Sequence, residues 1–272
     1  MNQNVPRLTA FQALLKGPFG SLPDFLIIGA QKCGTTALYD TLVQHPSVLP
    51  AYQKEVHYFD RYYNKGLLWY KANMPSRTAR KAAPEAIAGE AAPSYIYHPL
   101  AAQRVKSLLP NAKLIVLLRN PVNRAYSHYQ KELDRKDETI SFEQALDKEA
   151  ERVEGGLPKV LAGKHSHNWW HFSYMARGRY AEQLERWFKL FPREQFLILR
   201  SEDYAARTSE IVNEACRFLG LAENQITEFP RSNKSGYEKP LAPETRERLV
   251  NYFRPHNQRL YEMIGRDMEW DK

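Results

Sequence analysis

Residues 23–44, PDFLIIGAQKCGTTALYDTLVQ, place a lysine, a glycine and two threonines where an apolar run gives way to helical spacing. The run of four apolar residues is typical of a buried parallel strand. A helix N-terminus carries unpaired N–H donors and about half a positive charge, so it attracts phosphate or sulfate. The predicted ligands of such an anion are Lys32 and the N–H groups of Gly34, Thr35 and Thr36.

A second phosphate-binding group follows a second apolar strand in KLIVLLRNPVNRAYSHY, residues 113–129. Arg119 ends this strand, and Asn120 with Pro121 is typical of a helix start. Ser127 comes eight residues after Arg119, on the predicted helix. A guanidinium group binds two phosphate oxygens and a hydroxyl binds a third, so the pair predicts a second phosphate site. The comparable strand of magnesium-dependent nucleotide triphosphatases ends in aspartate instead.

An acid–base candidate lies in QKEVHYFDRYYNKGLLWY, residues 53–70. Side chains alternate along an extended chain, so Glu55 and His57 are expected on one face, pointing into one cleft. An unperturbed glutamate has a pKa of about 4.3 and is a weak base for an alcohol. Glu55 can therefore take such a proton only while the alcohol oxygen forms its new bond.

The order of the lysine and the glycine in the loop from Ala30 to Thr36 resembles that of a known family. In nucleotide triphosphatases the lysine follows the second glycine, whereas Lys32 precedes Gly34. AQKCGTT resembles the 5′-phosphosulfate loop of sulfotransferases that use 3′-phosphoadenosine 5′-phosphosulfate (PAPS). Arg119 and Ser127 resemble the site of these enzymes for the 3′-phosphate. The resemblance implies a P-loop-like sulfotransferase fold.

The acid–base segment resembles the EVHFFD segment of the heparan sulfate 3-O-sulfotransferases, and the chain from Leu22 to Trp270 resembles these enzymes and their bacterial relatives. This implies that Glu55 is the base and that His57 and Asp60 support it. In one departure, Ala91 stands where the family has a lysine, which predicts a site less suited to a polyanionic sugar. The resemblance also implies that a loop covers the nucleotide through Lys234, Gly236 and Tyr237.

Strands that alternate with helical stripes predict one α/β domain over residues 22–272, with a mainly parallel sheet flanked by helices. Residues 1–21 are expected to be an N-terminal extension. The apolar fraction of 43% is enough for a sizeable core. Helices are predicted in residues 98–109, from Ser141 to about Ala150, and in residues 180–191 and 211–219, and a strand in residues 196–199.

Residues 152–177 lack a clear period and contain several glycines, histidines and tryptophans. The segment is expected to be either a lid over the acceptor or a mobile surface loop. His165 and His167 have a spacing that can ligate metal, but no convincing further ligands follow nearby, so no metal site is predicted. Cys33 is interpreted as a spectator, although a helix start beside Lys32 can lower the pKa of a thiol.

The net charge of +8 and the pI of about 9.3 favour an anionic partner such as PAPS. Nucleic acid is disfavoured, because the chain lacks zinc-finger spacing, a recognition-helix motif and an RNA-binding aromatic signature. No transmembrane segment is expected, since no stretch of about 18 apolar residues occurs. With two cysteines and no secretory pattern, a cytoplasmic location is the simplest expectation, and the oligomeric state is not indicated.

Together these features predict an enzyme that transfers the sulfuryl group of PAPS to a hydroxyl and releases adenosine 3′,5′-bisphosphate without a metal. The acceptor can be a carbohydrate, a lipid or polyketide alcohol, or a small metabolite. Two alternatives stay open. One is a P-loop-type nucleotide kinase, which the order of the loop and Arg119 argue against. The other is a non-catalytic binder of nucleotides or nucleic acid, which has no use for Glu55.

Overall fold

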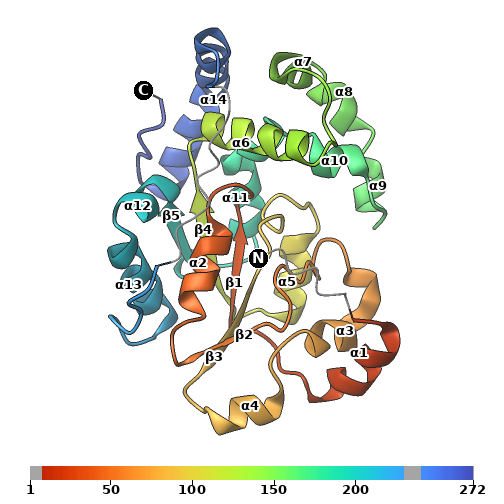
Figure 1. Cartoon of the computed structure of the whole chain (residues 1–272), viewed down its shortest axis with the longest axis vertical. Coiled ribbons are helices and arrows are strands. Elements are labelled where there is room, and N and C mark those ends of the chain that lie inside the picture. The colour runs from red at the N-terminus through yellow and green to blue at the C-terminus, as the bar shows by residue number, and fades with distance from the viewer. Residues whose placement is uncertain (1–7, 230–239, 272) are drawn as a thin grey trace.

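The computed structural model describes residues 8–229 and 240–271. These residues form a five-stranded sheet in the order β2-β3-β1-β4-β5, in which all four strand pairs are parallel (Figure 1). The strands are β1 (Phe25–Gly29), β2 (Val48–Pro50), β3 (Ile87–Ala91), β4 (Lys113–Leu118) and β5 (Phe196–Arg200). Helices flank the sheet, which confirms the predicted single α/β domain with a mainly parallel sheet.

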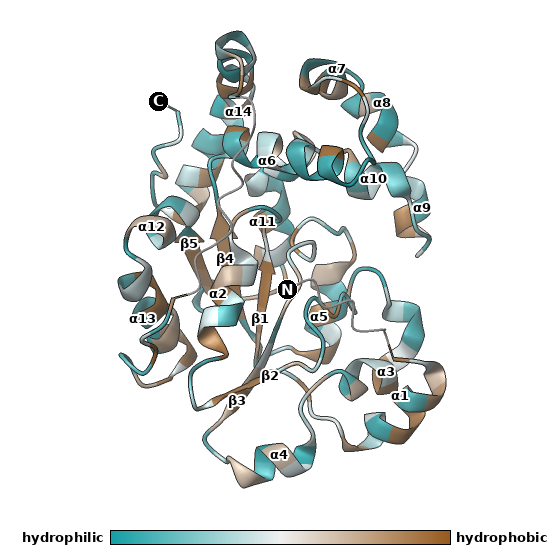
Figure 2. Cartoon of the chain, viewed as in Figure 1, coloured by the Kyte–Doolittle hydropathy of each residue, from teal (hydrophilic) through white to brown (hydrophobic). Residues whose placement is uncertain are grey.

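The strands β1 and β4 form the centre of the core. All five residues of β1 are buried, as are the last five of β4, and Figure 2 shows hydrophobic residues along both. Such uninterrupted apolar strands arise because helices cover both faces of a parallel sheet. The neighbouring β3 contributes Gly89, where an added Cβ would lie 2.1 Å from the ring of Phe25. Glycine therefore lets the Phe25 ring pack directly on β3.

Right-handed crossovers assign the helices to the two faces of the sheet. Helix α2 (Thr35–Leu42) leads from β1 toward β2 and β3, whereas α5 (Ala101–Leu108) and α11 (Tyr180–Phe188) lead the opposite way to β4 and β5. Helix α2 therefore lies on the face opposite α5 and α11 (Figure 1). Helix α13 (Thr208–Leu219) contacts α2 on its face.

The predicted helices are present, with small shifts at their ends. Ser141 and Gln144 form the predicted capping box at the start of α7 (Phe142–Asp147). The helix was expected to run to about Ala150, but it ends before Lys148, and a separate helix α8 (Glu149–Glu154) begins there. That part of the prediction is wrong, because the apolar spacing continues across Lys148 while the helix itself is interrupted.

A smaller core lies between α6 (Pro121–Asp134) and α14 (Pro243–Ile264), where Val122 and Tyr126 belong to the same buried cluster as Leu249 and Phe253. The remaining helices are α1 (Ala10–Lys16), α3 (Gly66–Ala72), α4 (Arg77–Ala82), α9 (Leu157–Leu161), α10 (His167–His171) and α12 (Ser201–Ala206). Short 3-10 turns are η1 (Gly17–Phe19), η2 (Tyr63–Lys65), η3 (Ala176–Gly178) and η4 (Arg193–Gln195). Across the described ranges, no helix has the length and apolar character needed to cross a bilayer.

The strand order places three chain segments at one edge of the sheet. From β1 the chain first adds β2 and β3 on one side and then β4 and β5 on the other, so the order reverses between β1 and β4. Open α/β sheets bind ligands outside the carboxyl ends of their strands at such a switch point. The Lys32 loop follows β1, Arg119 follows β4, and the Glu55 segment follows β2. All three predicted site segments therefore leave the same edge.

Candidate active site

The loop after β1 leads into the N-terminus of α2. Gly34 is the N-cap residue of this helix, and its φ of 93° lies in the left-handed region that favours glycine. Lys32 also has a left-handed φ, 68°. The first turn of α2 contains no acidic residue to neutralise the positive end of the helix. Lys32, Gly34, Thr35 and Thr36 thus lie on the strand–loop–helix that the sequence predicts, and their anion-binding roles stay predictions.

Arg119 lies against this loop. Its Nη1 donates a hydrogen bond to the backbone oxygen of Lys32 over 3.3 Å. Its own backbone oxygen accepts a hydrogen bond from the hydroxyl of Tyr180 over 2.9 Å, which fixes the end of β4. Asn120 caps α6 as predicted, and Ser127 is buried on the second turn of that helix. The structure therefore brings Arg119 to the Lys32 loop and places Ser127 on the helix that follows.

Glu55, His57 and Asp60 come together, but not through an extended chain. Residues 52–62 form bends and turns after β2, and φ is 52° at Glu55 and 56° at His57. The ring of His57 lies between two carboxylates, with Nε2 3.3 Å from Oε2 of Glu55 and Nδ1 2.9 Å from Oδ2 of Asp60. The predicted extended conformation is therefore wrong. Tight turns, not alternation, place the two side chains in contact.

This arrangement determines the charges of the three side chains. Burial lowers the pKa of His57, but the charge and hydrogen bond of Asp60, together with Glu55, raise it to about 9. Burial raises the pKa of each carboxyl, but the interactions with His57 outweigh it, so Glu55 and Asp60 both titrate below their usual pKa. An imidazolium therefore lies between two carboxylates at neutral pH. The side chain of Glu55 is 41% exposed and that of Asp60 is fully buried, so a substrate can reach Glu55.

Lys131 is a candidate that the sequence analysis missed. It lies on α6, four residues after Ser127, and its charge interacts with those of Lys32 and Glu55. Burial and the neighbouring Arg135 lower the pKa of Lys131 to about 8. The lysine is thus within electrostatic reach of both the phosphate loop and the acid–base group. The available signal was its spacing from Ser127, since residues four apart share one face of a helix.

A buried hydrogen-bond network of Tyr70, Glu90 and Tyr95 holds the loop that contains His57. The hydroxyl of Tyr95 accepts the backbone N–H of Tyr58 over 2.9 Å and donates to Oε1 of Glu90 over 3.1 Å. The hydroxyl of Tyr70 donates to the same oxygen over 2.7 Å. Burial raises the pKa of Glu90 to about 7. This carboxyl at the end of β3 therefore anchors the loop that carries the acid–base group.

Comparison with known families decides what kind of protein carries this site. The family model described as a sulfotransferase domain matches residues 22–252, which include the Lys32 loop, Arg119 and the Glu55 segment. The chain belongs to the sulfotransferase family. The predicted family is therefore confirmed, and the alternatives of a nucleotide kinase or a non-catalytic binder receive no support.

Relatives of this sulfotransferase come from several groups of organisms. The membrane-associated sulfotransferase kil1 of Dictyostelium discoideum is 28% identical over 94% of the chain and 68% of that protein. Mouse heparan sulfate glucosamine 3-O-sulfotransferase 3B1 is 34% identical over 92% of the chain, which spans 65% of the mouse enzyme. The crystal structure of a sulfotransferase from Alicyclobacillus acidocaldarius matches with a TM-score of 0.73 and 30% identity, covering 93% of this chain and 100% of that one. This last match confirms the predicted sulfotransferase fold.

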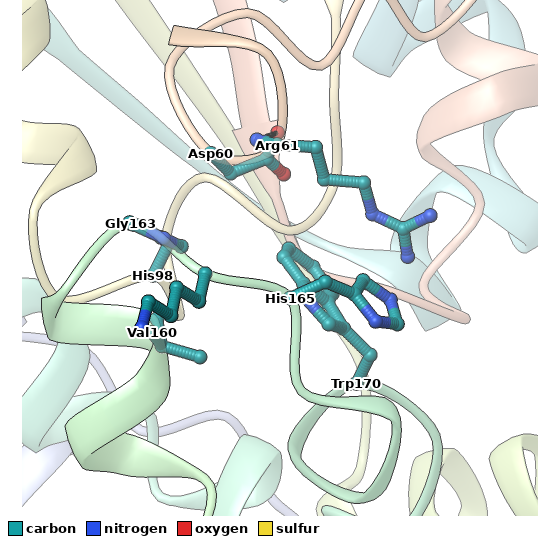
Figure 3. A pocket seen from close by; sticks show the side chains of 8 residues that line it. Asp60, Arg61, His98, Val160, Gly163, His165 and Trp170 are labelled. Atoms are coloured by element: carbon teal, nitrogen blue, oxygen red, sulfur yellow. Dashed lines mark hydrogen bonds between the residues drawn. The ribbon is translucent and has the colours of Figure 1, made fainter. Parts of the chain in front are cut away.

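A small pocket of the sulfotransferase lies beside Asp60 (Figure 3). Its volume of about 40 Å³ suits one or two waters, whereas sites that enclose a ligand typically measure about 300–1,000 Å³. The guanidinium group of Arg61 lies 4.2 Å from the centre of the Trp170 ring at this pocket. The lining residues are Asp60, Arg61, His98, Val160, Gly163, Lys164, His165 and Trp170. The pocket is therefore too small to enclose a molecule of more than a few atoms.

Residues 152–177 of the sulfotransferase form short helices and turns rather than one irregular loop. Trp169 and Trp170 are buried, and Trp169 stacks on Tyr97 with ring centroids 4.5 Å apart. The cation of Arg177 lies 4.4 Å from the centre of the Tyr97 ring. The segment is therefore packed onto the domain next to the pocket. Its role as an acceptor lid stays a prediction.

Cys33 is buried in the Lys32 loop, and its Sγ lies 3.7 Å from the hydroxyl of Tyr180. Burial raises its pKa to about 11, contrary to the lowering that a helix start can cause. A neutral, buried thiol fits the predicted spectator role. Ala91 is buried at the end of β3. The predicted cofactor residues Lys234, Gly236 and Tyr237 lie outside the described residues.

Proposed function

We propose that this sulfotransferase transfers the sulfuryl group of PAPS to an acceptor hydroxyl and releases adenosine 3′,5′-bisphosphate. The observation that carries the proposal is the hydrogen bond from Arg119 to the backbone oxygen of Lys32. It joins the two predicted phosphate sites at the carboxyl ends of β1 and β4. The 5′-phosphosulfate is assigned to Lys32 and the N–H groups of Gly34, Thr35 and Thr36. The 3′-phosphate is assigned to Arg119 and Ser127.

In the proposed reaction, Glu55 is the base. The acceptor oxygen forms a bond to sulfur while the bond between sulfur and the bridging oxygen of PAPS breaks, and the acceptor proton passes to the carboxylate of Glu55. His57 holds that carboxylate by its Nε2 and keeps it ionised. Lys32 and the N-terminus of α2 stabilise the charge that develops on the departing bisphosphate. The step therefore relies on positioning and electrostatics.

The charges around Glu55 bear on the class of acceptor. The charges of Lys131 and Arg61 both lower the pKa of Glu55. These cations favour an acceptor whose hydroxyl lies near a negative group, in contrast to the weaker suitability for polyanionic sugars expected from Ala91. Among a carbohydrate, a lipid or polyketide alcohol and a small metabolite, the name of the mouse relative supports a carbohydrate. We therefore propose an anionic sugar as the first acceptor class to test.

The nucleotide assignment is tested by calorimetry with adenosine 3′,5′-bisphosphate, ADP and ATP–Mg²⁺. The bisphosphate should bind most tightly, and Arg119→Ala should weaken its binding roughly ten- to hundredfold, because a charge-assisted hydrogen bond contributes about 1.5–3 kcal/mol. Arg193→Ala is the matched control, since Arg193 lies just before β5, at the opposite edge of the sheet. Tighter binding of ATP–Mg²⁺ would instead favour a nucleotide kinase.

A further inference from the structure

Helix α10 lies beside the end of α6 (Figure 1). Histidine and acidic side chains converge there. Nδ1 of His171 on α10 lies 2.7 Å from Oε2 of Glu132 on α6 and 3.5 Å from Oδ2 of Asp137. One ligand atom from each of these three side chains lies within 4.8 Å of the other two. His167, one turn before His171, brings its Nε2 to 3.7 Å from Oδ1 of Asp137. Three potential metal ligands therefore face one another, and His167 lies beside them.

This cluster differs from a solvated acidic surface. The side chain of Glu132 is 1% exposed and that of His171 is 16% exposed. His128, one turn before Glu132 on α6, is fully buried, and its Nε2 lies 3.3 Å from Oε1 of Glu132. Nδ1 of His128 has no hydrogen-bond partner among the described residues. The buried carboxylate of Glu132 therefore lies between two imidazole rings, and carboxylate and imidazole are ligand types that divalent transition metals bind.

We propose that Glu132, Asp137 and His171 bind one divalent transition-metal ion, with water as a further ligand, and that Zn²⁺ matches the site best. Imidazole nitrogen and carboxylate oxygen are ordinary zinc ligands. Tetrahedral bonds of about 2.0–2.2 Å place ligand atoms about 3.3 Å apart. Nδ1 of His171 lies 2.7 Å from Glu132 and 3.5 Å from Asp137, on either side of that value. A ligating imidazole nitrogen must be deprotonated, so Nδ1 of His171 carries no proton when zinc is bound.

The sequence could not reveal this site, because its ligands lie far apart in the chain. Glu132 precedes His171 by 39 residues and reaches it only through the packing of the two helices. The ion has a structural role in this proposal. It fixes α10 to the end of α6, and Trp170, which lines the pocket, is part of α10. Zinc binding itself does not depend on the proposed sulfuryl transfer.

The test uses the full chain after chelator treatment. Calorimetry with ZnCl₂ should show one site per chain, and the melting temperature should rise with zinc concentration, because zinc binds the folded state. Co²⁺ should give the visible absorption of a tetrahedral site. His171→Ala should weaken zinc binding at least about a hundredfold, since changes to outer-shell partners alone cost 10- to 100-fold. Asp137→Asn, which changes a partly exposed side chain, is the second variant if His171→Ala folds poorly.

His256→Ala is the control, because His256 pairs with Glu182 in a different part of the fold. It should leave the zinc affinity unchanged. Adenosine 3′,5′-bisphosphate binding measured on all variants reports whether the nucleotide side is still folded. Zinc binding that is absent, is not stoichiometric, or is equal in wild type, His171→Ala and Asp137→Asn would overturn the proposal. The cluster would then be a set of direct contacts between histidine and carboxylate side chains.

Discussion

In the proposed reaction Glu55 acts as a base although its pKa is lowered rather than raised. We expect Glu55→Gln to reduce kcat by about 10²- to 10⁴-fold, the usual contribution of a general base. Affinity for adenosine 3′,5′-bisphosphate should not change, because the carboxylate acts on the acceptor. Turnover assays and calorimetry on the same preparation measure the two effects. The exposed Glu210, on α13, provides the control Glu210→Gln. A near wild-type rate in Glu55→Gln would make Glu55 a structural residue.

His57 couples the active site to the pH dependence of stability. Its pKa is about 9 in the folded chain and about 6.5 when unperturbed, so the folded state holds the proton more tightly. The resulting stabilisation is complete below about pH 6.5 and disappears as the pH rises to about 9. Its upper limit is about 3 kcal/mol. The difference in melting temperature between wild type and His57→Gln should therefore shrink between pH 6 and pH 9.5. A constant difference would show that His57 does not carry this proton.

Lys131 is expected to select among acceptors by its charge. Lys131→Met should raise the KM for a carboxylated acceptor about tenfold, since a charged contact contributes about 1.5 kcal/mol or more. The KM for a matched neutral alcohol should hardly change. Steady-state kinetics with the paired acceptors measure both values, with Lys159→Met on the exposed side of α9 as control. Equal losses for both acceptors would mean that Lys131 acts on Glu55 or the nucleotide instead.

The segment from residue 52 to residue 62 consists of bends and turns, which make few of the backbone hydrogen bonds found in helices and strands. Its conformation therefore depends on the side chains that it packs against. Tyr95→Phe removes the hydroxyl that joins Tyr58 to Glu90. We expect a loss of about 1–3 kcal/mol in the free energy of unfolding, because buried polar groups lose their partner. The kcat should also fall while bisphosphate affinity is kept.

Tyr204→Phe is the matched control for this prediction. The hydroxyl of Tyr204 is also buried and contacts Oγ1 of Thr41 at 3.2 Å, on the α2 side of the sheet. Denaturant titrations should show a similar loss of stability in both variants. Turnover should fall only in Tyr95→Phe. If both variants lost turnover equally, the network below the loop would have no special part in positioning Glu55.

The sequence predicted well those elements that short segments encode. Buried apolar runs marked β1 and β4, and the capping residues Asn120 and Ser141 marked the starts of α6 and α7. The sequence did not predict the backbone conformation of segments that depend on side chains far away in the chain. The left-handed backbone at Glu55 and His57 lies above Tyr95, about 40 residues later in the chain, so no local pattern indicates it.

In the candidate active site, too, the features encoded by short segments were predicted and those that depend on distant residues were not. The Lys32 loop and Arg119 follow strands that local patterns reveal, and neighbouring parallel strands bring their ends together. Lys131 and the Glu132–His171 contact were missed because each depends on which face of a helix meets another segment. Periodicity shows that a helix has a face, but not what that face will touch.

At the scale of the whole molecule, the cytoplasmic location stays a prediction. Both Cys33 and Cys216 are free and buried, and burial raises the pKa of each thiol. Thiolates are the reactive form of cysteine, so neither residue is poised for oxidation. The cysteines are therefore compatible with more than one redox environment.

The pairing of β1 has a consequence for how the chain is made. Phe25 pairs with Gly89 on one side and with Lys113, 88 residues further along the chain, on the other. At roughly 5–20 residues per second, a ribosome needs about 4–18 s to add the second partner. Until then this buried strand can pair only on its β3 side. Nascent chains are expected to need a chaperone at this stage, and a pause in translation before residue 118 would prolong the exposure of the strand that carries the phosphate loop.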